Sequence, residues 1–268
     1  MNKFYIQIVF FLLIIPLYVN NKTLATELVP KKDKKHKSKK IYSTYDNTQL
    51  IYERNKHLLY TDTKETINAC RFMNDALKQL EYHATSKEGY KLYGTNSIYY
   101  MYSYKKKHRG NTRVDKIKYI IKNPNKYTGL INKFWDPDSS NFFYLGSTKR
   151  KIVRVYGPNL VMIQHRCKVW PWSRQKYFYA LAAKFKISEN KTIIVMASGN
   201  INDHNRKNKK HFENTIVESA NLFQAEVDSE DDIRSGKLKK MFVHLNGYIV
   251  EKKNGHIYIT YIESIKGW

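Results

Sequence analysis

The second half of the chain is a run of strand-like segments, and this run constrains the fold more than any other feature of the sequence. Residues 152–156 and 160–170 are predicted to be strands, and a Gly-Pro-Asn turn separates the two segments. Further strand candidates follow, most of them separated by short loops. These candidates are residues 177–187, 192–198, 215–227, 241–250 and 256–265.

Side chains two residues apart lie on the same face of a strand, so each segment can be divided into two faces. In residues 177–187, Tyr177 and Tyr179 are predicted to lie on the face opposite Lys184 and Lys186. In the preceding segment one face is predicted to hold Val161, Ile163, His165, Cys167 and Val169.

Two helical stretches precede the strands. Residues 61–86 carry an apolar stripe at helical spacing, and Asp62 with Glu65 three residues later forms a capping box. Residues 114–135 are predicted to be helical in two pieces, interrupted at Asn123-Pro124. Helices followed by a run of strands predict an α+β fold with an antiparallel sheet.

The two cysteines cannot form a disulfide scaffold or an all-cysteine zinc site. Cys70 lies on the apolar stripe of residues 61–86, so a buried free thiol is predicted, with a disulfide to Cys167 as the alternative. The nine histidines are scattered, and His204 and His211 lie in a Lys/Asn-rich loop. No metal site is predicted.

The N-terminus has the features of a secretory signal peptide. Lys3 supplies a positive start, residues 6–17 are almost wholly apolar, and Thr23-Leu24-Ala25 forms a small-residue cleavage site. The apolar core is shorter than the roughly 20 residues of a membrane-spanning helix. We therefore predict a secreted chain from which residues 1–25 are removed, with an uncleaved membrane anchor as the alternative.

The chain is strongly basic, with 48 Lys and Arg, 23 Asp and Glu, and a net charge of +25. Such a charge implies an anionic partner, either nucleic acid or an acidic membrane surface. Residues 31–40 form a low-complexity block that we predict to bind anionic lipid headgroups, with a solvated linker as the alternative. Residues 41–268 still carry +18. The lysines of the block are Lys31, Lys32, Lys34, Lys35, Lys37, Lys39 and Lys40.

Motifs for phosphate-loop, dinucleotide, zinc-protease and serine-hydrolase chemistry are absent from the sequence. A basic secreted ribonuclease would need two histidines and a lysine at one phosphate, and His165, Lys168 and His244 have no spacing that supports this arrangement. The sequence therefore predicts a protein that is not an enzyme and needs no cofactor.

Three segments, in order, resemble the START (StAR-related lipid transfer) domain. Residues 133–136 (KFWD) are similar to its helix-terminal Trp-Asp, and residues 170–179 (WPWSRQKYFY) to its Pro-containing turn and following strand. Residues 247–250 and 255–268 are similar to its last two strands and the Gly-Trp before its final helix. The resemblance implies a helix-grip fold with a curved antiparallel sheet and helices around a lipid cavity, the C-terminal helix missing after Trp268.

The secretory start, the Lys/Asn/Tyr/Ile-rich composition and residues 121–137 (IKNPNKYTGLINKFWDP) resemble the Fam-a family of rodent malaria parasites. That resemblance implies phospholipid as cargo, phosphatidylcholine foremost, and a location in the parasitophorous vacuole or, after export, in the host erythrocyte. The expected organisation is a signal peptide (1–25), a basic linker (26–48), an N-terminal helical segment (49–88) and a START-like domain (89–268), acting as a monomer.

A curved sheet with helices on one face can leave an interior that holds a lipid. A quaternary ammonium headgroup favours aromatic faces, so Trp135, Tyr177 and Tyr179 are the predicted cage, with Asp136 as counter-charge. Gln164 and His165 are weaker candidates, because only one parity of their strand can face the cavity.

Two alternatives use the charge without a cavity. One is a surface protein that binds anionic membranes or host glycans without transferring lipid, in a salt-dependent way. The other is nucleic-acid binding through the Tyr-rich residues 98–104 and the basic residues 105–109, which are read more simply as a strand running into a charged turn. The signal peptide and the START-like segments favour a membrane and no nucleic acid.

Overall fold

The computed structural model describes residues 46–98, 100–139, 147–168, 172–208 and 212–267. The chain divides into two units, Met1–Ile41 and Tyr42–Trp268, and the described residues belong to the second. The predicted signal peptide and the lysine block at residues 31–40 lie outside the described residues. The predicted helical segment at residues 49–88 belongs to the same unit as the strands.

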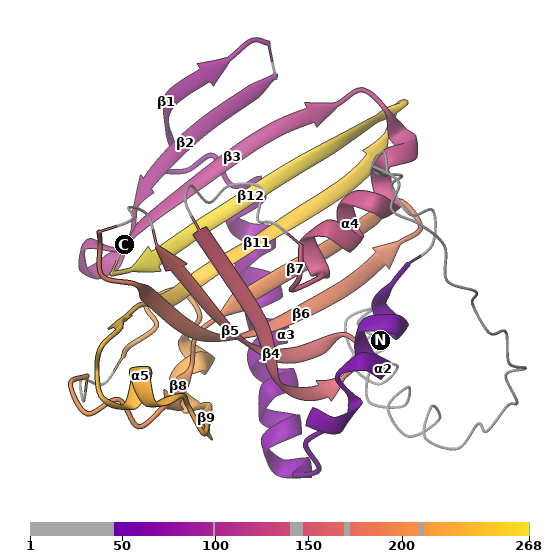
Figure 1. Ribbon diagram of the computed structural model, residues 1–268. Coiled ribbons are helices and arrows are strands. Elements are labelled where there is room, and N and C mark those ends of the chain that lie inside the picture. The colour runs from indigo at the N-terminus through magenta and orange to yellow at the C-terminus, as the bar shows by residue number, and fades with distance from the viewer. Residues whose placement is uncertain (1–45, 99, 140–146, 169–171, 209–211, 268) are drawn as a thin grey trace, which may run out of the picture. The chain divides into compact units, whose positions relative to one another are not determined.

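One large, curved sheet dominates this unit (Figure 1). Its strands lie in the order β1-β2-β3-β12-β11-β7-β6-β5-β4, every neighbouring pair is antiparallel, and β10 adds to β6 in parallel. A smaller parallel pair, β8 with β9, lies outside this sheet. The bounds are β1 Lys91–Asn96, β2 Met101–Lys107, β3 Arg113–Ile121, β4 Ser147–Gly157, β5 Leu160–Lys168, β6 Lys176–Ser188, β7 Lys191–Ala197, β8 Asn200–Asn202, β9 Gln224–Glu226, β10 Lys239–Lys240, β11 Phe242–Lys253 and β12 His256–Lys266.

Tight turns join neighbouring strands where the sequence predicts them. Asn254 and Gly255 connect β11 to β12 with φ angles of 52° and 72°, which is the left-handed backbone that a two-residue hairpin turn requires. Pro158 and Asn159 connect β4 to β5. The pairing of β12 with β3 then joins the last strand of the chain to the first three.

Helix α3 (Thr63–Thr85) covers one face of the sheet (Figure 1). The Asp62 carboxylate caps the helix by accepting from the backbone N–H groups of Lys64 (2.8 Å) and Glu65 (3.2 Å), as predicted. The Glu65 carboxylate, predicted to complete a capping box, instead accepts from Arg154 (2.5 Å) and from the Tyr156 hydroxyl (2.5 Å). These bonds fix the first turn of α3 to β4.

A glycine allows α3 to lie close to the sheet. A Cβ atom on Gly247 of β11 would lie 2.3 Å from the backbone oxygen of Ile194 and 3.0 Å from Cδ2 of Leu80 on α3. Both distances are shorter than van der Waals contact, so only glycine fits here. We call the face that α3 covers the outer face.

Helix α4 (Tyr127–Trp135) lies on the opposite face, which we call the inner face (Figure 1). Phe134 of α4 stacks on Tyr248, which follows Gly247 in β11 and therefore points to the other side of the sheet. The remaining helices are short: α2 Thr48–Arg54, α5 Asp231–Arg234, and 3-10 turns at Lys56–Leu58, Arg109–Asn111, Pro124–Lys126 and Glu218–Leu222.

Two sequence predictions are wrong. The first predicted helical piece, from residue 114 to the interruption at Asn123-Pro124, is mostly strand β3; its Val, Ile and Tyr residues suit a strand, and β3 pairs with β2 and β12 on either side. Residues 215–227 form a 3-10 turn and the short β9 instead of one long strand. There the Asn214 carboxamide oxygen accepts from the backbone N–H groups of Ile216 and Val217, which fixes a turn.

The two cysteines are free thiols, so the alternative of a disulfide between them is wrong. Cys70 lies on the buried side of α3 and Cys167 lies on β5. Burial raises the pKa of each thiol to about 11. Both thiols therefore remain protonated and unreactive at neutral pH.

Candidate functional site

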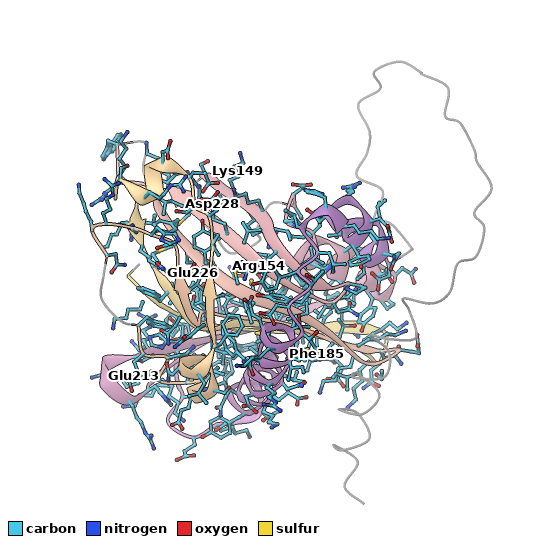
Figure 2. All side chains as sticks on the ribbon, turned by 90° about the horizontal axis from the view of Figure 1, so that it is seen from below. Lys149, Arg154, Phe185, Glu213, Glu226 and Asp228 are labelled. Carbon is cyan, nitrogen blue, oxygen red and sulfur yellow. The ribbon has the colours of Figure 1, made fainter. Side chains whose placement is uncertain are left out.

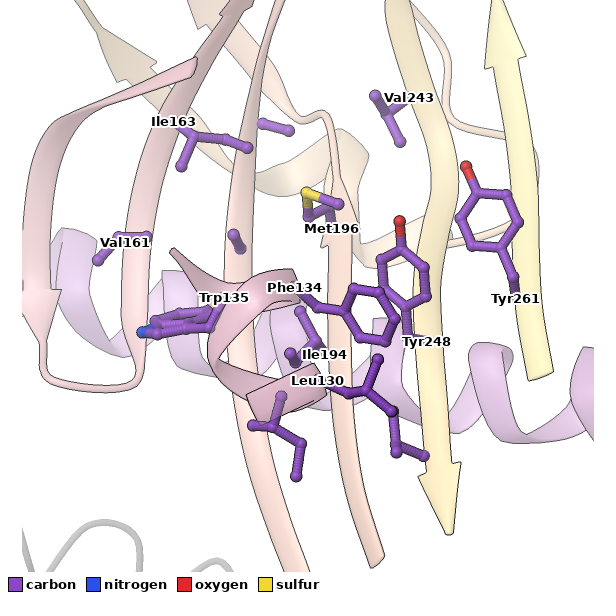
Figure 3. Close-up of a cluster of buried hydrophobic side chains, with 14 of the residues drawn as sticks. Leu130, Phe134, Trp135, Val161, Ile163, Ile194, Met196, Val243, Tyr248 and Tyr261 are labelled. Carbon is purple, nitrogen blue, oxygen red and sulfur yellow. The ribbon is translucent and has the colours of Figure 1, made fainter. Parts of the chain in front are cut away.

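The inner face is a continuous apolar surface built from α4 and the strands beneath it (Figure 3). The rings of Phe134 and Tyr248 stack with centroids 4.1 Å apart and planes 6° from parallel. Tyr261 of β12 lies beside Tyr248, with ring centroids 4.8 Å apart. Alternating residues of β5, β6, β7, β11 and β12 extend this surface across most of the sheet.

A small void lies between α4 and strands β4 to β7. Its volume is about 20 Å³, and Trp135, Arg150, Ile163 and Met196 are among the residues that line it. Ligand pockets for molecules of lipid size measure roughly 300–1,000 Å³. The void therefore marks a place where the packing is incomplete, and it can admit an acyl chain only if α4 or its side chains move.

Trp135 contributes an unpaired hydrogen-bond donor to this region. The residue is 6% exposed, and its indole Nε1–H has no hydrogen-bond partner in the structure. Leaving a buried donor unpaired costs about 1–3 kcal/mol. An oxygen of a bound molecule that accepted from Nε1 would remove this cost.

A second polar group lies on β11 and β12. The Asn246 side-chain N–H donates to the Tyr261 hydroxyl (2.8 Å), which in turn donates to the Glu263 carboxylate (2.5 Å). The carboxamide oxygen of Asn246 has no hydrogen-bond partner in the structure, although the residue is 2% exposed. The inner face thus combines a large apolar area with a few oriented polar atoms, which is the usual composition of a small-molecule site.

Asp136, the predicted counter-charge, has a structural role at the end of α4. Its carboxylate accepts from the backbone N–H of Asp138 (2.9 Å), and its backbone oxygen accepts from the Arg150 guanidinium (2.8 Å). Arg150 also donates to the backbone oxygen of Ser139 (2.9 Å). Arg150 therefore holds the segment after α4 against β4.

His165 lies on the inner face, on the same side of β5 as Ile163. Its ring stacks on Phe178 with centroids 4.8 Å apart and planes 3° from parallel. Burial, together with the positive charge of Arg150, lowers the pKa of His165 to about 3. The imidazole is therefore neutral at physiological pH, and it can take part in a site as a hydrogen-bonding group but not as a positive charge.

Gln164, Tyr177 and Tyr179 lie on the outer face, on the side of the sheet opposite Trp135. The register pairs Gln164 with Tyr179 and places their side chains on the same side, away from Phe178 and His165. The predicted aromatic cage is therefore wrong: Trp135 and the two tyrosines are separated by the sheet. Of the six predicted site residues, only Trp135 and His165 have side chains placed on the inner apolar surface.

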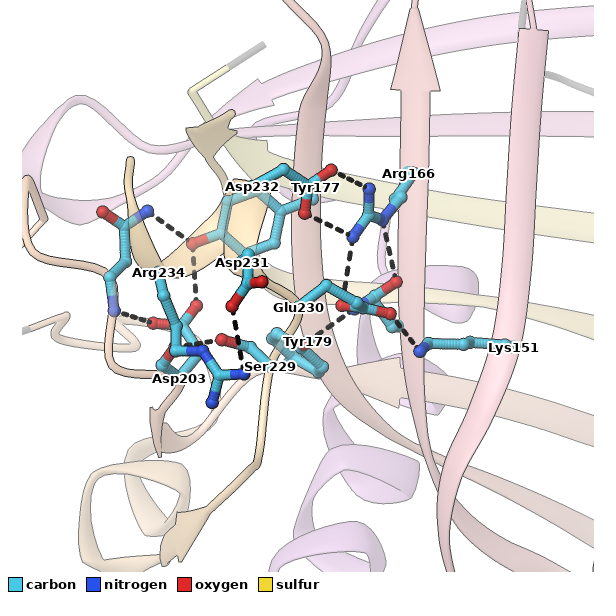
Figure 4. A network of polar contacts seen from close by, with 12 residues as sticks. Lys151, Arg166, Tyr177, Tyr179, Asp203, Ser229, Glu230, Asp231, Asp232 and Arg234 are labelled. Carbon is cyan, nitrogen blue, oxygen red and sulfur yellow. Dashed lines mark hydrogen bonds and ion pairs between the residues drawn. The ribbon is translucent and has the colours of Figure 1, made fainter. Parts of the chain in front are cut away.

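The outer-face residues form a polar network that attaches loops to the sheet (Figure 4). Gln164 donates to Tyr179 (2.6 Å) and to Glu230 (2.7 Å), and Arg166 pairs with Asp232 (2.6 Å). Burial acts to raise the pKa of Glu230, but hydrogen bonds from Lys151 and Gln164 outweigh it and lower this pKa to about 2.

The same network includes Tyr177. The Tyr177 hydroxyl donates to Asp203 (2.8 Å) and accepts from Asn205 (2.8 Å), while Asp203 also pairs with Lys240 (3.0 Å). These polar groups satisfy one another, so the network is explained by loop attachment without a ligand.

A larger hollow of about 820 Å³ lies beside β8 and β9 and opens to solvent. Its wall is mainly polar, with Asn202, His204 and Gln224 among the exposed residues. Arg154 and Glu226 lie next to one another at this hollow, and Arg154 donates to the backbone oxygen of Glu226 (Figure 2). An open polar hollow cannot shield acyl chains from water, so it is a poor lipid site despite its volume.

The sequence reasoning missed Arg150, Asn246, Tyr261 and Glu263. The signal was present in part, because Tyr261 and Glu263 lie two residues apart in a predicted strand and so share a face. Which of the two faces is the inner one depends on where α4 packs, and no local pattern shows this. The predicted membrane-surface lysines, residues 31–40, lie outside the described residues.

Neither a metal centre nor a membrane-spanning helix is found in the described part of the chain. Among the described residues, no three His, Cys, Asp or Glu side chains are grouped so that they could hold a metal ion. In the same part of the chain, no helix is long and apolar enough to cross a membrane.

Comparison with known proteins gives matches only among solved structures. No protein-family model matches the sequence, and no curated protein matches it. Human StAR-related lipid transfer protein 5 is similar in structure, with a TM-score of 0.52 and 10% identity, over 75% of this chain and 83% of that one. Human STARD10 has a TM-score of 0.45 and 10% identity, over 70% of this chain and 65% of that one.

The similarity to StAR-related lipid transfer protein 5 defines the fold class. The chain has the START helix-grip fold, in which a curved antiparallel sheet packs with helices, as the sequence predicts. No sequence match accompanies this structural likeness, so membership of the Fam-a family stays a prediction.

Proposed function

We propose that this protein binds a phospholipid on the inner face of its START-like fold and transfers it between membranes, without catalysing a reaction. The observation that carries the proposal is the unpaired, buried indole N–H of Trp135 beside the void under α4, within a wide apolar surface. Apolar side chains would cover acyl chains, and the N–H would donate to an oxygen of the headgroup or ester. Phosphatidylcholine is the proposed cargo.

Lipid entry would require movement of α4, whose buried face packs on the sheet mainly through apolar side chains. The helix has no side-chain hydrogen bond at its N-cap. The Tyr127 hydroxyl lies within hydrogen-bonding distance of the Thr192 hydroxyl (3.1 Å), and the Asn132 carboxamide oxygen accepts from the backbone N–H of Asn47 (3.1 Å). The remaining contacts with the sheet are mainly apolar, and acyl chains can replace apolar contacts at little cost in free energy.

The proposed site of action follows from the N-terminal sequence. A signal peptide at residues 1–25 would send the chain out of the cell that makes it, and the Fam-a resemblance would place it in the parasitophorous vacuole or the host erythrocyte. The lysine block at residues 31–40 would then hold the protein near anionic headgroups.

The proposal is tested by lipid extraction and by transfer. Protein purified from cells should carry phospholipid detectable by native mass spectrometry, and it should move labelled phosphatidylcholine between vesicles. Protein that is repeatedly empty and also inactive in transfer would disprove the proposal.

Two neighbouring residues of β5 provide a matched pair of variants. Ile163 lines the void, whereas Met162 points to the outer face, and both are at most 5% exposed. Ile163→Phe should fill the void and lower lipid uptake. Met162→Phe adds similar bulk on the other face, at a comparable cost of about 1–3 kcal/mol, and should leave uptake unchanged.

The alternative function, glycan binding without lipid transfer, is favoured by one observation. The open hollow near β8 and β9 exposes the side-chain amides of Asn202 and Gln224, which can both donate to and accept from sugar hydroxyls. Binding to neutral glycans by a protein that fails in the transfer assay would support this alternative over the lipid site.

A further inference from the structure

The β1–β2 hairpin and the strands beside it present exposed apolar side chains on the outer face. Ile98 is 79% exposed, and Tyr100, Tyr102 and Tyr258 are 38–45% exposed. Tyr102 pairs with Lys118 of β3, which pairs with Thr260 of β12, so Tyr102, Lys118 and Tyr258 lie on one face. Ile98 and Tyr100 lie in the turn between β1 and β2, and Tyr100 is next to Lys122. We call Ile98, Tyr100, Tyr102, Lys118, Lys122 and Tyr258 the hairpin surface.

The end of α3 explains why this surface is uncovered. The Lys116 ammonium donates to the backbone oxygens of His83 (3.1 Å) and Ser86 (2.6 Å), so the C-terminal end of α3 is held above Lys116 on β3. Lys118 and Lys122 lie two and six residues further along the same face and are exposed. The outer face beyond the end of α3 is therefore open to solvent.

The region around the hairpin surface is strongly basic. Residues 87–122 contain ten Lys or Arg and two Asp or Glu, a net charge of +8. Within the hairpin surface, the Lys122 ammonium lies over the ring of Tyr100, 4.8 Å from the ring centre. This contact holds a positive charge against an aromatic ring at the surface.

We infer that the hairpin surface docks on an anionic lipid bilayer. Tyrosine is enriched at the level of lipid headgroups, lysines are attracted to anionic headgroups, and an aliphatic tip such as Ile98 gains by entering the acyl boundary. The inference extends the proposed function, because it names the part of the fold that meets the membrane.

The ring contacts disfavour nucleic acid as the partner. A base-stacking platform needs a free aromatic face. Tyr100, which belongs to the hairpin surface, has Lys122 over its ring. The most exposed apolar residue of the hairpin surface, Ile98, is aliphatic and offers no stacking surface, whereas a bilayer accepts it.

The first experiment measures co-sedimentation of the full chain with vesicles of phosphatidylcholine mixed with phosphatidylserine. The double variant Lys118→Glu/Lys122→Glu should weaken binding by about thirtyfold. The control Lys64→Glu/Lys237→Glu makes the same change of net charge at exposed lysines outside the hairpin surface. Equal losses in the two variants would overturn the inference, because binding would then depend on net charge alone.

The second experiment reports on the surroundings of Ile98 itself, so vesicle binding through residues 1–45 alone would give no signal. Cys70 and Cys167 are at most 7% exposed, so an Ile98→Cys variant can be labelled selectively with an environment-sensitive dye. Anionic vesicles should shift its emission to the blue. The same label on Leu222→Cys, at a position 82% exposed in the 3-10 turn Glu218–Leu222, should not respond.

An unshifted tip label in the presence of bound vesicles would overturn the inference. So would single-stranded RNA that protects the label while vesicles do not, since the surface would then be a nucleic-acid site. Lipid uptake is measured separately from detergent-solubilised phosphatidylcholine, without a bilayer. Failure of the inner-face site and failure of the docking surface are therefore distinguishable.

Discussion

Replacing Trp135 by Phe removes one hydrogen-bond donor from the inner face while keeping an aromatic ring there. Trp135 is 6% exposed, lines the void under α4, and has an unpaired Nε1–H. The substitution therefore separates the packing role of the side chain from its role in binding.

The effect on stability should be small because two contributions oppose each other. Loss of part of the buried ring area costs about 1 kcal/mol at 25 cal/mol per Å². Removal of an unpaired buried donor returns about 1–3 kcal/mol. We therefore expect the free energy of unfolding, measured in urea, to change by no more than about 1–2 kcal/mol, with no net loss.

The effect on lipid affinity should be large if Nε1 donates to a phosphate oxygen. A hydrogen bond to a charged group contributes about 1.5–3 kcal/mol, which is roughly a 10- to 100-fold change in the dissociation constant. Titration with phosphatidylcholine should show this loss. Diacylglycerol, which lacks phosphate, should bind both proteins about equally.

Trp172→Phe is the control for the loss of an indole, since Trp172 is 85% exposed. Unchanged affinity for phosphatidylcholine together with a clear loss of stability would refute the reasoning, because Trp135 would then serve packing alone. An equal loss for both lipids would show that the N–H contacts something other than phosphate.

Three further predictions concern stability, each measured by urea unfolding. Gly247→Ala should cost about 3 kcal/mol because the new Cβ atom would meet Ile194 and Leu80. Gly157→Ala should be neutral, because a Cβ atom at that position would have no atom within 4 Å. Equal effects of the two substitutions would contradict the close packing of α3. Burial lowers the pKa values of His83, His165 and His244 to about 4, 3 and 4, below the unfolded value of about 6.5. The histidines of the unfolded state therefore take up protons at a higher pH than those of the folded state. The free energy of unfolding should drop between pH 6.5 and 4, by about 2 kcal/mol per histidine at pH 5. A His83→Gln variant with the same pH dependence of stability would be evidence against this. Arg166→Gln should cost about 1 kcal/mol, because Asp232 loses its guanidinium partner while Glu230 keeps Lys151 and Gln164, and both carboxylates are more than a third exposed. Lipid transfer by the folded variant should be unchanged, since a change in transfer would place the outer network in the site.

Local patterns were sufficient for the elements that have a clear cap, or an apolar run or regular alternation between turn residues. Helix α3 begins at the predicted cap because Asp62 satisfies the first free N–H groups whatever the helix packs against. Strands β5, β6, β7, β11 and β12 also agree with the predictions, because their alternation or apolar runs lie between turn residues such as Asn254 and Gly255.

Residues 113–121 show where local reasoning fails. Val114, Ile117, Ile120 and Ile121 are spaced three or four residues apart, which matches a helix, yet the segment is β3. Its state is decided by pairing with β12, whose residues are about 140 positions later in the chain. A short segment with ambiguous periodicity takes the structure that its distant neighbours stabilise.

The site was only partly predictable for a related reason. Strand periodicity correctly separated Gln164 from His165, but it could not tell which face would receive α4. Strand β6 is buried on both faces. The sequence around Tyr177 and Tyr179 is therefore as apolar as that of a strand lining a cavity. Their partners Asp203 and Glu230, which identify the outer network, come from loops 26 and 51 residues later.

The hairpin surface and the inner face are on opposite sides of the sheet but are joined by a short piece of chain. Lys122 of the hairpin surface directly follows β3, and α4 begins five residues later at Tyr127. Between them, Pro124 restricts the backbone and the Asn123 carboxamide caps the 3-10 turn by accepting from the N–H of Asn125 (3.0 Å). The surface that we expect to meet the membrane is therefore five residues along the chain from the helix that must move to admit a lipid, and the Pro124 turn between them has restricted backbone freedom.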